Sequence, residues 1–227
     1  MSWYAKPRGA YYYNGTEGKS NILEIGSYLS RNNYTVEAQS GVIGNVMAES
    51  GLNPWRWQSD SVSLAGGYGL FQYTPASGYI NLSGIPNHSP NMSTSQQTSG
   101  ATPEDAEGQL YVFVNNTLGK WVSTCWRSYW DTTTYATLYQ QRQRILTEYG
   151  DGSRISMTQF ARINNVWDAT FVFLACFEGP LVPNMSARFG NAQQAYEILT
   201  GSPIPPTPPP VPTYSSKLKI WMMIKPF

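Results

Sequence analysis

Seven of the ten residues from 203 to 212 are proline, and this run constrains how the rest of the chain can fold. Proline lacks a backbone N–H and has a fixed φ angle, so such a run favours an extended, semi-rigid linker. The 227-residue chain therefore divides into a predicted domain over residues 1–200, a linker over residues 201–213 and a tail over residues 214–227. A domain of that length can bury one substantial core.

Apolar residues recur mostly at helical spacing within the predicted domain. Helices are predicted over residues 20–29, 35–50, 103–117, 135–149, 156–163, 169–177 and 187–200. Thr35 is the expected N-cap of the second helix, and Gly51 is its expected C-terminal stop. Residues 53–74 have no helical period and predict a small β or irregular insert, while residues 83–102 predict a long polar surface loop. We therefore expect a mainly helical α+β domain with one small insert.

The composition narrows the choice of partners. Charged residues make up 13% of the chain, against roughly 25% in ordinary soluble domains, and the net charge is +1. No basic run suggests nucleic-acid binding, and no stretch of about 18 apolar residues predicts a membrane span. Residues 1–13 lack the apolar core of a signal peptide, so synthesis without one is expected. Cys125 and Cys176 are expected to be buried thiols rather than a disulfide framework, although whether they pair stays open.

Residues 214–227 carry Leu218, Ile220, Trp221, Met222, Met223 and Ile224 among lysines, and fourteen residues are too few to form a domain. Three interpretations are open: a docking peptide for a larger assembly, the start of a truncated second domain, or an interfacial amphipathic segment. We favour docking, because a stiff linker followed by an apolar tip suits a tether.

The single histidine excludes most hydrolytic machinery from this chain. His88 lies in a polar, loop-like stretch, and no nucleophile elbow accompanies it. Zinc ligands at close spacing and a phosphate-binding glycine loop are also missing from the sequence. We therefore expect no metal and no cofactor, and carboxylate chemistry remains.

Glu49 is the carboxylate whose position is most informative. It ends the second predicted helix and shares a face with Val42, Asn45 and Val46. This mostly apolar face predicts partial burial, and the helix C-terminus adds the negative end of the helix dipole. Both effects favour the protonated carboxyl that a glycosidic general acid requires. An exposed glutamate at a frayed helix end is the alternative.

The surrounding motifs resemble known families. Residues 49–54 read ESGLNP and residues 67–72 read GYGLFQ, and together they resemble the hallmark of the lysozyme superfamily and lytic transglycosylases. Residues 57–58 (WQ), 68–77 (YGLFQYTPAS) and 173–180 (FLACFEGP) resemble the phage tail lysozyme family. The likeness is greatest to the lysozyme domain of tail-tip or tail-knob proteins from small short-tailed phages of Gram-positive bacteria. It covers about residues 21–200, without the linker or the tail.

This resemblance implies a lysozyme-like fold and a virion-associated peptidoglycan hydrolase at the phage tail tip. Such an enzyme cleaves the glycan strand between N-acetylmuramic acid and N-acetylglucosamine, so that the tail crosses the host cell wall during DNA delivery. The implied partners are bacterial peptidoglycan and other phage tail proteins, the latter through residues 214–227. A lytic transglycosylase, an inactive lysozyme-fold tail module and a lysis-stage endolysin remain alternatives.

The resemblance also assigns roles to individual residues. Glu49 matches the catalytic glutamate, and Ser50 matches the small hydroxyl residue that supports the following turn. Gln72, Tyr68 and Tyr73 match positions that line the sugar-binding cleft. The aromatic candidates for stacking on sugar rings are Trp55, Trp57, Tyr68 and Tyr73.

A second catalytic carboxylate is harder to assign. Animal-type lysozymes carry an aspartate at the position of Gly67, and the nearby acid in this sequence is Asp60. Asp60 is a candidate water activator or cation stabiliser, with an ordinary loop aspartate as the alternative. Glu178 matches a Glu-Arg-Pro-like element in which Gly179 replaces the arginine, and we interpret Glu178 as structural. Without a second carboxylate, a glutamate acting alone in a lytic transglycosylase remains possible.

Overall fold

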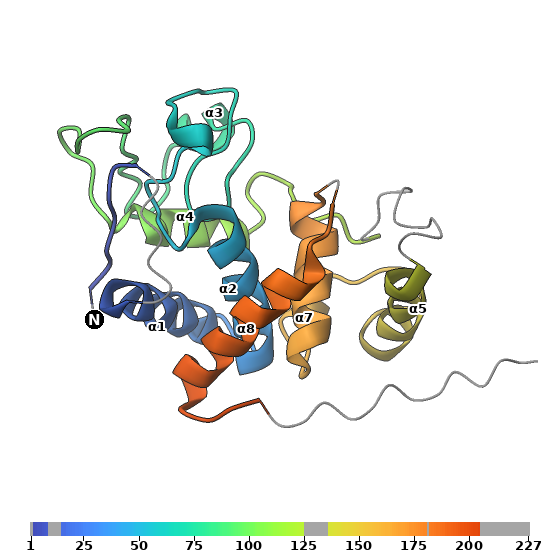
Figure 1. The fold of residues 1–227 in the computed structure, drawn as a ribbon. Helices are drawn as coiled ribbons and strands as arrows, with labels where there is room; N and C mark the ends of the chain where they lie inside the picture. The colour runs from blue at the N-terminus through green and yellow to red at the C-terminus, as the bar shows by residue number, and fades with distance from the viewer. Residues whose placement is uncertain (1, 9–14, 125–135, 181, 205–227) are drawn as a thin grey trace, which may run out of the picture.

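The computed structural model describes residues 2–8, 15–124, 136–180 and 182–204. The predicted docking tail, most of the proline linker and Cys125 lie outside these residues. The described part is mainly helical, as predicted (Figure 1). Its elements are α1 (Thr16–Arg31), α2 (Val36–Ser50), the 3-10 turn η1 (Gln58–Asp60), α3 (Ser77–Ile80), α4 (Asp105–Val114), α5 (Ala136–Tyr149), α6 (Met157–Phe160), α7 (Val166–Phe173), the π-helical turn η4 (Leu174–Glu178) and α8 (Met185–Thr200).

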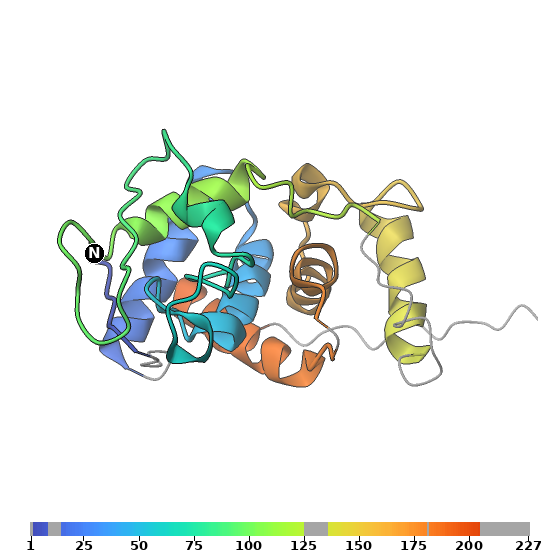
Figure 2. The same ribbon diagram turned by 90° about the horizontal axis from the view of Figure 1, so that it is seen from above.

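Helix α2 is the centre of the fold, with α1, α7 and α8 around it (Figures 1 and 2). Its N-cap is Thr35, whose side chain accepts a hydrogen bond from Ala38 N, and Gly51 ends it in the left-handed conformation at φ 63°. Both predicted boundaries are confirmed. Every residue of α2 from Ala38 to Met47 is buried, so the body of the helix that carries Glu49 is packed on all sides.

Two glycines let the neighbouring helices approach α2 closely. A Cβ built on Gly41 would lie 2.6 Å from the backbone of Ala169 in α7. A Cβ on Gly44 would lie 2.7 Å from the backbone oxygen of Arg188 in α8. Since side chains cannot fit at these distances, the glycines set the spacing of α7 and α8 from the helix that carries Glu49.

The insert after α2 is irregular rather than a sheet. Among the described residues it contains two isolated antiparallel bridges, Trp57 to Tyr68 and Tyr68 to Tyr73, and no longer strand. The irregular form of the predicted insert is therefore observed, and a small β-sheet is not.

Asp105, the first residue of α4, fixes the insert to the helical body. One carboxylate oxygen accepts hydrogen bonds from Tyr68 Oη at 3.2 Å and Gln109 Nε2 at 2.7 Å. The other accepts from Tyr79 Oη at 2.7 Å and Ser89 N at 2.9 Å. Burial raises the pKa of Asp105, and these hydrogen bonds offset part of that rise. This single carboxyl group therefore ties the insert and the polar loop to α4.

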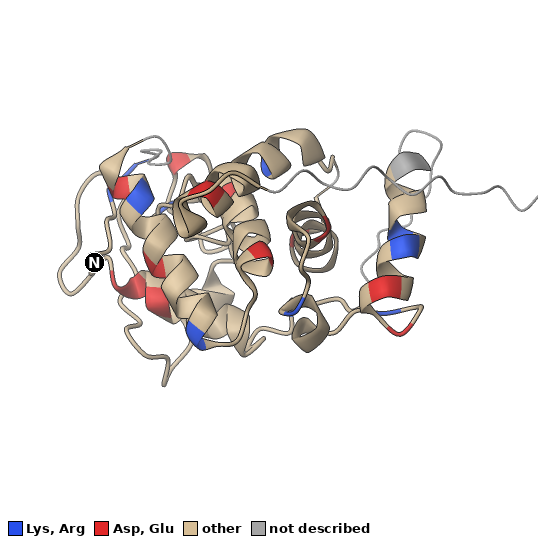
Figure 3. Cartoon of the chain, turned by 90° about the horizontal axis from the view of Figure 1, so that it is seen from below, with Lys and Arg blue, Asp and Glu red and all other residues tan. Residues whose placement is uncertain are grey.

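Cys176 is disulfide-bonded in the structure. The expectation that it is a free thiol is therefore wrong. Burial does not distinguish the two cases, because free and cross-linked cysteines are both commonly buried. No helix in the described ranges is long and apolar enough to cross a membrane. In the ribbon of Figure 3, acidic and basic positions are scattered over the described helices and loops.

Candidate active site

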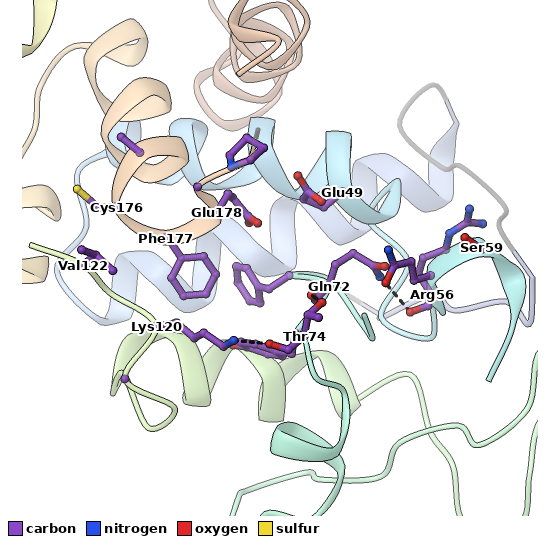
Figure 4. Close-up of a pocket in the computed structure, with 17 residues that line it drawn as sticks. Glu49, Arg56, Ser59, Gln72, Thr74, Lys120, Val122, Cys176, Phe177 and Glu178 are labelled. Atoms are coloured by element: carbon purple, nitrogen blue, oxygen red, sulfur yellow. Dashed lines mark hydrogen bonds between the residues drawn. The ribbon is translucent and has the colours of Figure 1, made fainter. Parts of the chain in front are cut away.

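A cleft of about 770 Å³ opens beside the C-terminal turn of α2. Its volume lies within the roughly 300–1,000 Å³ of typical small-molecule sites. Glu49 and Glu178 lie along one wall, and Gln72, Thr74 and Lys120 lie opposite them (Figure 4). The cleft therefore collects side chains from α2, the insert, the segment after α4 and the end of η4.

Glu49 occupies the last turn of α2, and its side chain is 23% exposed. Its Oε1 accepts a hydrogen bond from Arg188 Nη2 of α8 at 2.5 Å. Arg188 is 8% exposed, and its Nη1 also donates to Asn45 Oδ1 at 3.0 Å. Asn45 is itself fixed, because its Nδ2 donates to the backbone oxygens of Gly41 and Thr170. A chain of buried hydrogen bonds thus sets the position of the Glu49 carboxylate.

Glu178 brings a second carboxyl group into the same cleft. It is the last residue of η4, and Gly179 ends that turn at φ 53° with its N–H bonded to Leu174 O. Glu178 Oε1 is buried and has no hydrogen-bond partner within the described chain. Burial, and then the charge of Glu49, raise the pKa of Glu178 well above its usual range, while Arg188 and Lys120 partly offset this.

Three of the residues predicted from the sequence meet at the cleft: Glu49, Gln72 and Tyr73. Gln72 has φ 45°, and its Nε2 donates to the backbone oxygens of Arg56 at 3.1 Å and Gly69 at 2.9 Å. The amide nitrogen is therefore committed to the protein. Tyr73 is largely buried, and its hydroxyl donates to Gln109 O at 2.9 Å.

The other predicted site residues lie elsewhere. Tyr68 is fully buried, and Trp57 is 2% exposed with its Nε1 donating to Asn91 O at 2.8 Å. Ser50 is buried, and its hydroxyl donates to Val46 O within α2. None of the three is among the described residues that line the cleft.

Asp60 also lies away from the cleft lining. Its side chain is 43% exposed and forms an ion pair with Arg56 Nη1 at 2.8 Å. Arg56 and Ser59 do line the cleft, so Asp60 is connected to the site through its ion pair with Arg56 and its chain neighbour Ser59.

Arg188 and Lys120 are site residues that the sequence did not reveal as such. Arg188 is 139 positions from Glu49 in the chain, so no local spacing connects them. Lys120 follows α4, and its ammonium donates to Thr74 O on the same wall of the cleft (Figure 4). Glu178 did carry a signal, because an acid that ends an apolar run just before a glycine is well placed to be buried.

Comparison with known proteins gives the class of this molecule. The profile of the phage tail lysozyme family matches residues 20–199, so the chain belongs to that family and is a lysozyme-like protein associated with phage tails. The resemblance predicted from the motifs is thereby confirmed. The chain is also similar to Morphogenesis protein 1 of Bacillus phage B103, with 26% identity over 191 residues. That alignment covers 84% of this chain and 42% of the relative, so the chain spans less than half of the relative's length.

Proposed function

We propose that this chain is a muramidase that cleaves peptidoglycan between N-acetylmuramic acid and N-acetylglucosamine. Its role would be to open the host cell wall for the phage tail during DNA delivery. The observation that carries the proposal is the placement of Glu49 at a rigid helix end, in a cleft large enough for a sugar, with its carboxylate held by Arg188. Family membership supports the substrate class.

In the proposed mechanism the glycan strand lies in the cleft, and protonated Glu49 donates its proton to the glycosidic oxygen. The bond from that oxygen to C1 of N-acetylmuramic acid breaks as an oxocarbenium-like state forms. The Glu49 carboxylate then takes a proton from the attacking water, whose oxygen bonds to C1. If the C6 hydroxyl of the same sugar attacks instead, the product is a 1,6-anhydro sugar and the enzyme is a lytic transglycosylase.

Neighbouring residues have supporting roles in this proposal. The Gln72 Nε2 group is used by the backbone, which leaves its carbonyl oxygen to accept a hydrogen bond from a substrate N–H or hydroxyl. Tyr73 is the predicted aromatic residue that lines the cleft, and because it is only 2% exposed we propose that it shapes the cleft wall beside the sugar. The buried Trp57, Tyr68 and Ser50 are proposed to support the walls rather than to contact substrate.

The Glu49→Gln variant tests the proposal. General acid catalysis contributes about 10²–10⁴-fold to a rate. The variant is therefore expected to clear purified Gram-positive cell walls at least about 10²-fold more slowly than the wild type. Asp60→Asn is the matched comparison: if Asp60 activates the water, it loses hydrolysis as well. A Glu49→Gln protein that clears walls at the wild-type rate refutes the assignment.

We further propose that residues 214–227, outside the described part, dock the protein to other tail proteins. Particles carrying the chain without these residues should lose the protein on washing, whereas full-length protein should stay with them. A full-length protein absent from washed particles would instead indicate a lysis-stage endolysin.

A further inference from the structure

Two carboxyl groups that line the cleft, and the guanidinium that binds one of them, come from three different helical elements. Glu49 comes from α2, Arg188 from α8 and Glu178 from η4. Arg188 forms an ion pair with Glu49 but has a buried Nε atom without a hydrogen-bond partner in the described chain, as does Glu178 at Oε1. Arg188 is thus ion-paired with Glu49, and its charge also acts on Glu178. Neither buried polar atom has a hydrogen-bond partner among the described residues.

The charge balance of this group determines how many protons it holds. One guanidinium neutralises one carboxylate, so a second ionised carboxylate would leave an uncompensated charge in a poorly solvated position. Glu49 takes the ion pair, which leaves the proton on Glu178. Consistent with this, burial and the Glu49 charge raise the pKa of Glu178.

The described state creates a difficulty for the proposed reaction. A general acid must hold a proton at the moment of bond cleavage, yet the Glu49 carboxylate is engaged in the ion pair with Arg188. We propose that Glu178 is a positioning residue of this site, which shares one proton with Glu49 and supplies it for the general-acid step. The inference rests on the proposed function, because it concerns the proton that Glu49 delivers.

The transfer is balanced in atoms and charge. The Glu178 carboxyl gives its proton to the Glu49 carboxylate, directly or through cleft water, and becomes a carboxylate. Arg188 and Lys120 both favour that charged form of Glu178. After Glu49 has protonated the leaving oxygen and taken a proton from water, it returns that proton to Glu178. The pair therefore ends each turnover with the one proton it began with.

The local backbone explains how Glu178 reaches the cleft. A regular α-helix would present the residues after Phe173 at the usual 100° intervals, whereas the π-helical turn changes this angle over Leu174–Glu178. Gly179 then ends the turn in a left-handed conformation that glycine adopts without strain. Such π-turns are frequent at functional sites, and this one ends at the carboxyl that faces Glu49.

Glu178 has charged or titratable neighbours on four surrounding segments. They are Glu49 of α2, Arg188 of α8, Lys120 of the segment after α4 and Tyr73 of the insert. Tyr73 is neutral, since burial raises its pKa far above the usual range. The pH dependence of the cleft therefore reflects the titration of Glu178 in the field of these neighbouring groups.

The test is the pH profile of kcat/KM for wild-type protein and Glu178→Gln on purified peptidoglycan. Glutamine has the shape of a protonated glutamate but can neither release nor accept the shared proton. The variant should be active at acidic pH near the wild-type rate, where Glu49 takes its proton from solvent. The basic limb of its profile should move about one pH unit or more to lower pH. Glu104→Gln, an exposed carboxyl of the α4 N-terminus, is the matched control and should leave the profile unchanged.

Two results would overturn the inference. A basic limb at the wild-type position shows that Glu178 holds no proton for Glu49, and loss of activity at every pH with the fold retained shows that it acts directly. If the wild type itself releases nothing, the proposed function fails first, so the two failures are distinguishable.

A second measurement applies even if Glu178→Gln does not fold. Carbon-13 NMR of labelled glutamate carboxyl groups should show Glu178 titrating at lower pH in Glu49→Gln than in the wild type, because the neighbouring charge is gone. An unchanged Glu178 titration contradicts the sharing of a proton.

Discussion

Replacing Gly44 by alanine tests the close contact that brings Arg188 to Glu49. The new Cβ would lie 2.6 Å from Ala192 Cβ, 2.7 Å from Ala192 N and 2.7 Å from Arg188 O. Ordinary van der Waals contact begins at 3.4 Å, and two of these three atoms are backbone, so α8 must move away from α2 by several tenths of an ångström. Overpacking of this kind costs about 1–3 kcal/mol.

The matched control is Gly190→Ala on α8. Gly190 is exposed within its helix, and a Cβ there meets nothing within 4 Å. The same chemical change should therefore stabilise the protein by about 0.5–1 kcal/mol, the usual helix advantage of alanine over glycine. Because Gly44 gains the same advantage, the two variants differ only in crowding.

Urea unfolding followed by circular dichroism measures both changes. Gly44→Ala should lower the unfolding free energy, Gly190→Ala should raise it, and Gly44→Ala should also slow wall clearance because Arg188 moves with α8. Equal stability of Gly44→Ala and Gly190→Ala would show that α8 does not crowd Gly44.

Three further predictions concern the frame of the site. Asp105→Asn replaces one accepting carboxylate oxygen by an NH₂ group, which then faces N–H or O–H donors such as Gln109 Nε2. The free energy of unfolding, measured with urea at neutral pH, should fall by about 1–3 kcal/mol. Thr35→Ala removes the N-cap of α2 and should lower the unfolding free energy by about 0.5–2 kcal/mol in the same assay; an unchanged midpoint would refute the cap. Because burial raises the pKa of Glu178 in the folded state, the stability it contributes is present below the unfolded pKa of about 4.3 and is lost as the pH rises through the folded value. Wild-type stability should therefore fall relative to Glu178→Gln with rising pH, and a constant difference would count against the buried proton.

The helices were predictable because their signals are local. The apolar period, the Thr35 cap and the Gly51 stop all act within a few residues, and they define α2 as the structure has it. Glu49 and Gln72 could be predicted as cleft residues for the same reason, since each lies in a short sequence motif. The short helix α3 was not predicted, because four residues are too few to show a period.

The rest of the site depends on contacts between distant segments. Arg188 meets Glu49 only because Gly44 lets α8 approach α2, and no spacing in the sequence records that. In the irregular insert, no period indicates which side of the chain faces the cleft. Tyr73 lines it, while Tyr68 and Trp57 turn into the core. The proton balance of Glu178 depends on the charges of Glu49, Arg188 and Lys120 around it, which its position in the sequence does not reveal.

The most direct test of the central claim is mass spectrometry of the fragments released from purified Gram-positive peptidoglycan by the wild type and by Glu49→Gln. We expect wild-type fragments cut at N-acetylmuramic acid, with a free reducing end for hydrolysis or a 1,6-anhydro end for transglycosylation, and almost none from the variant. Fragments with N-acetylglucosamine at the cut end, or equal release by both proteins, would contradict it.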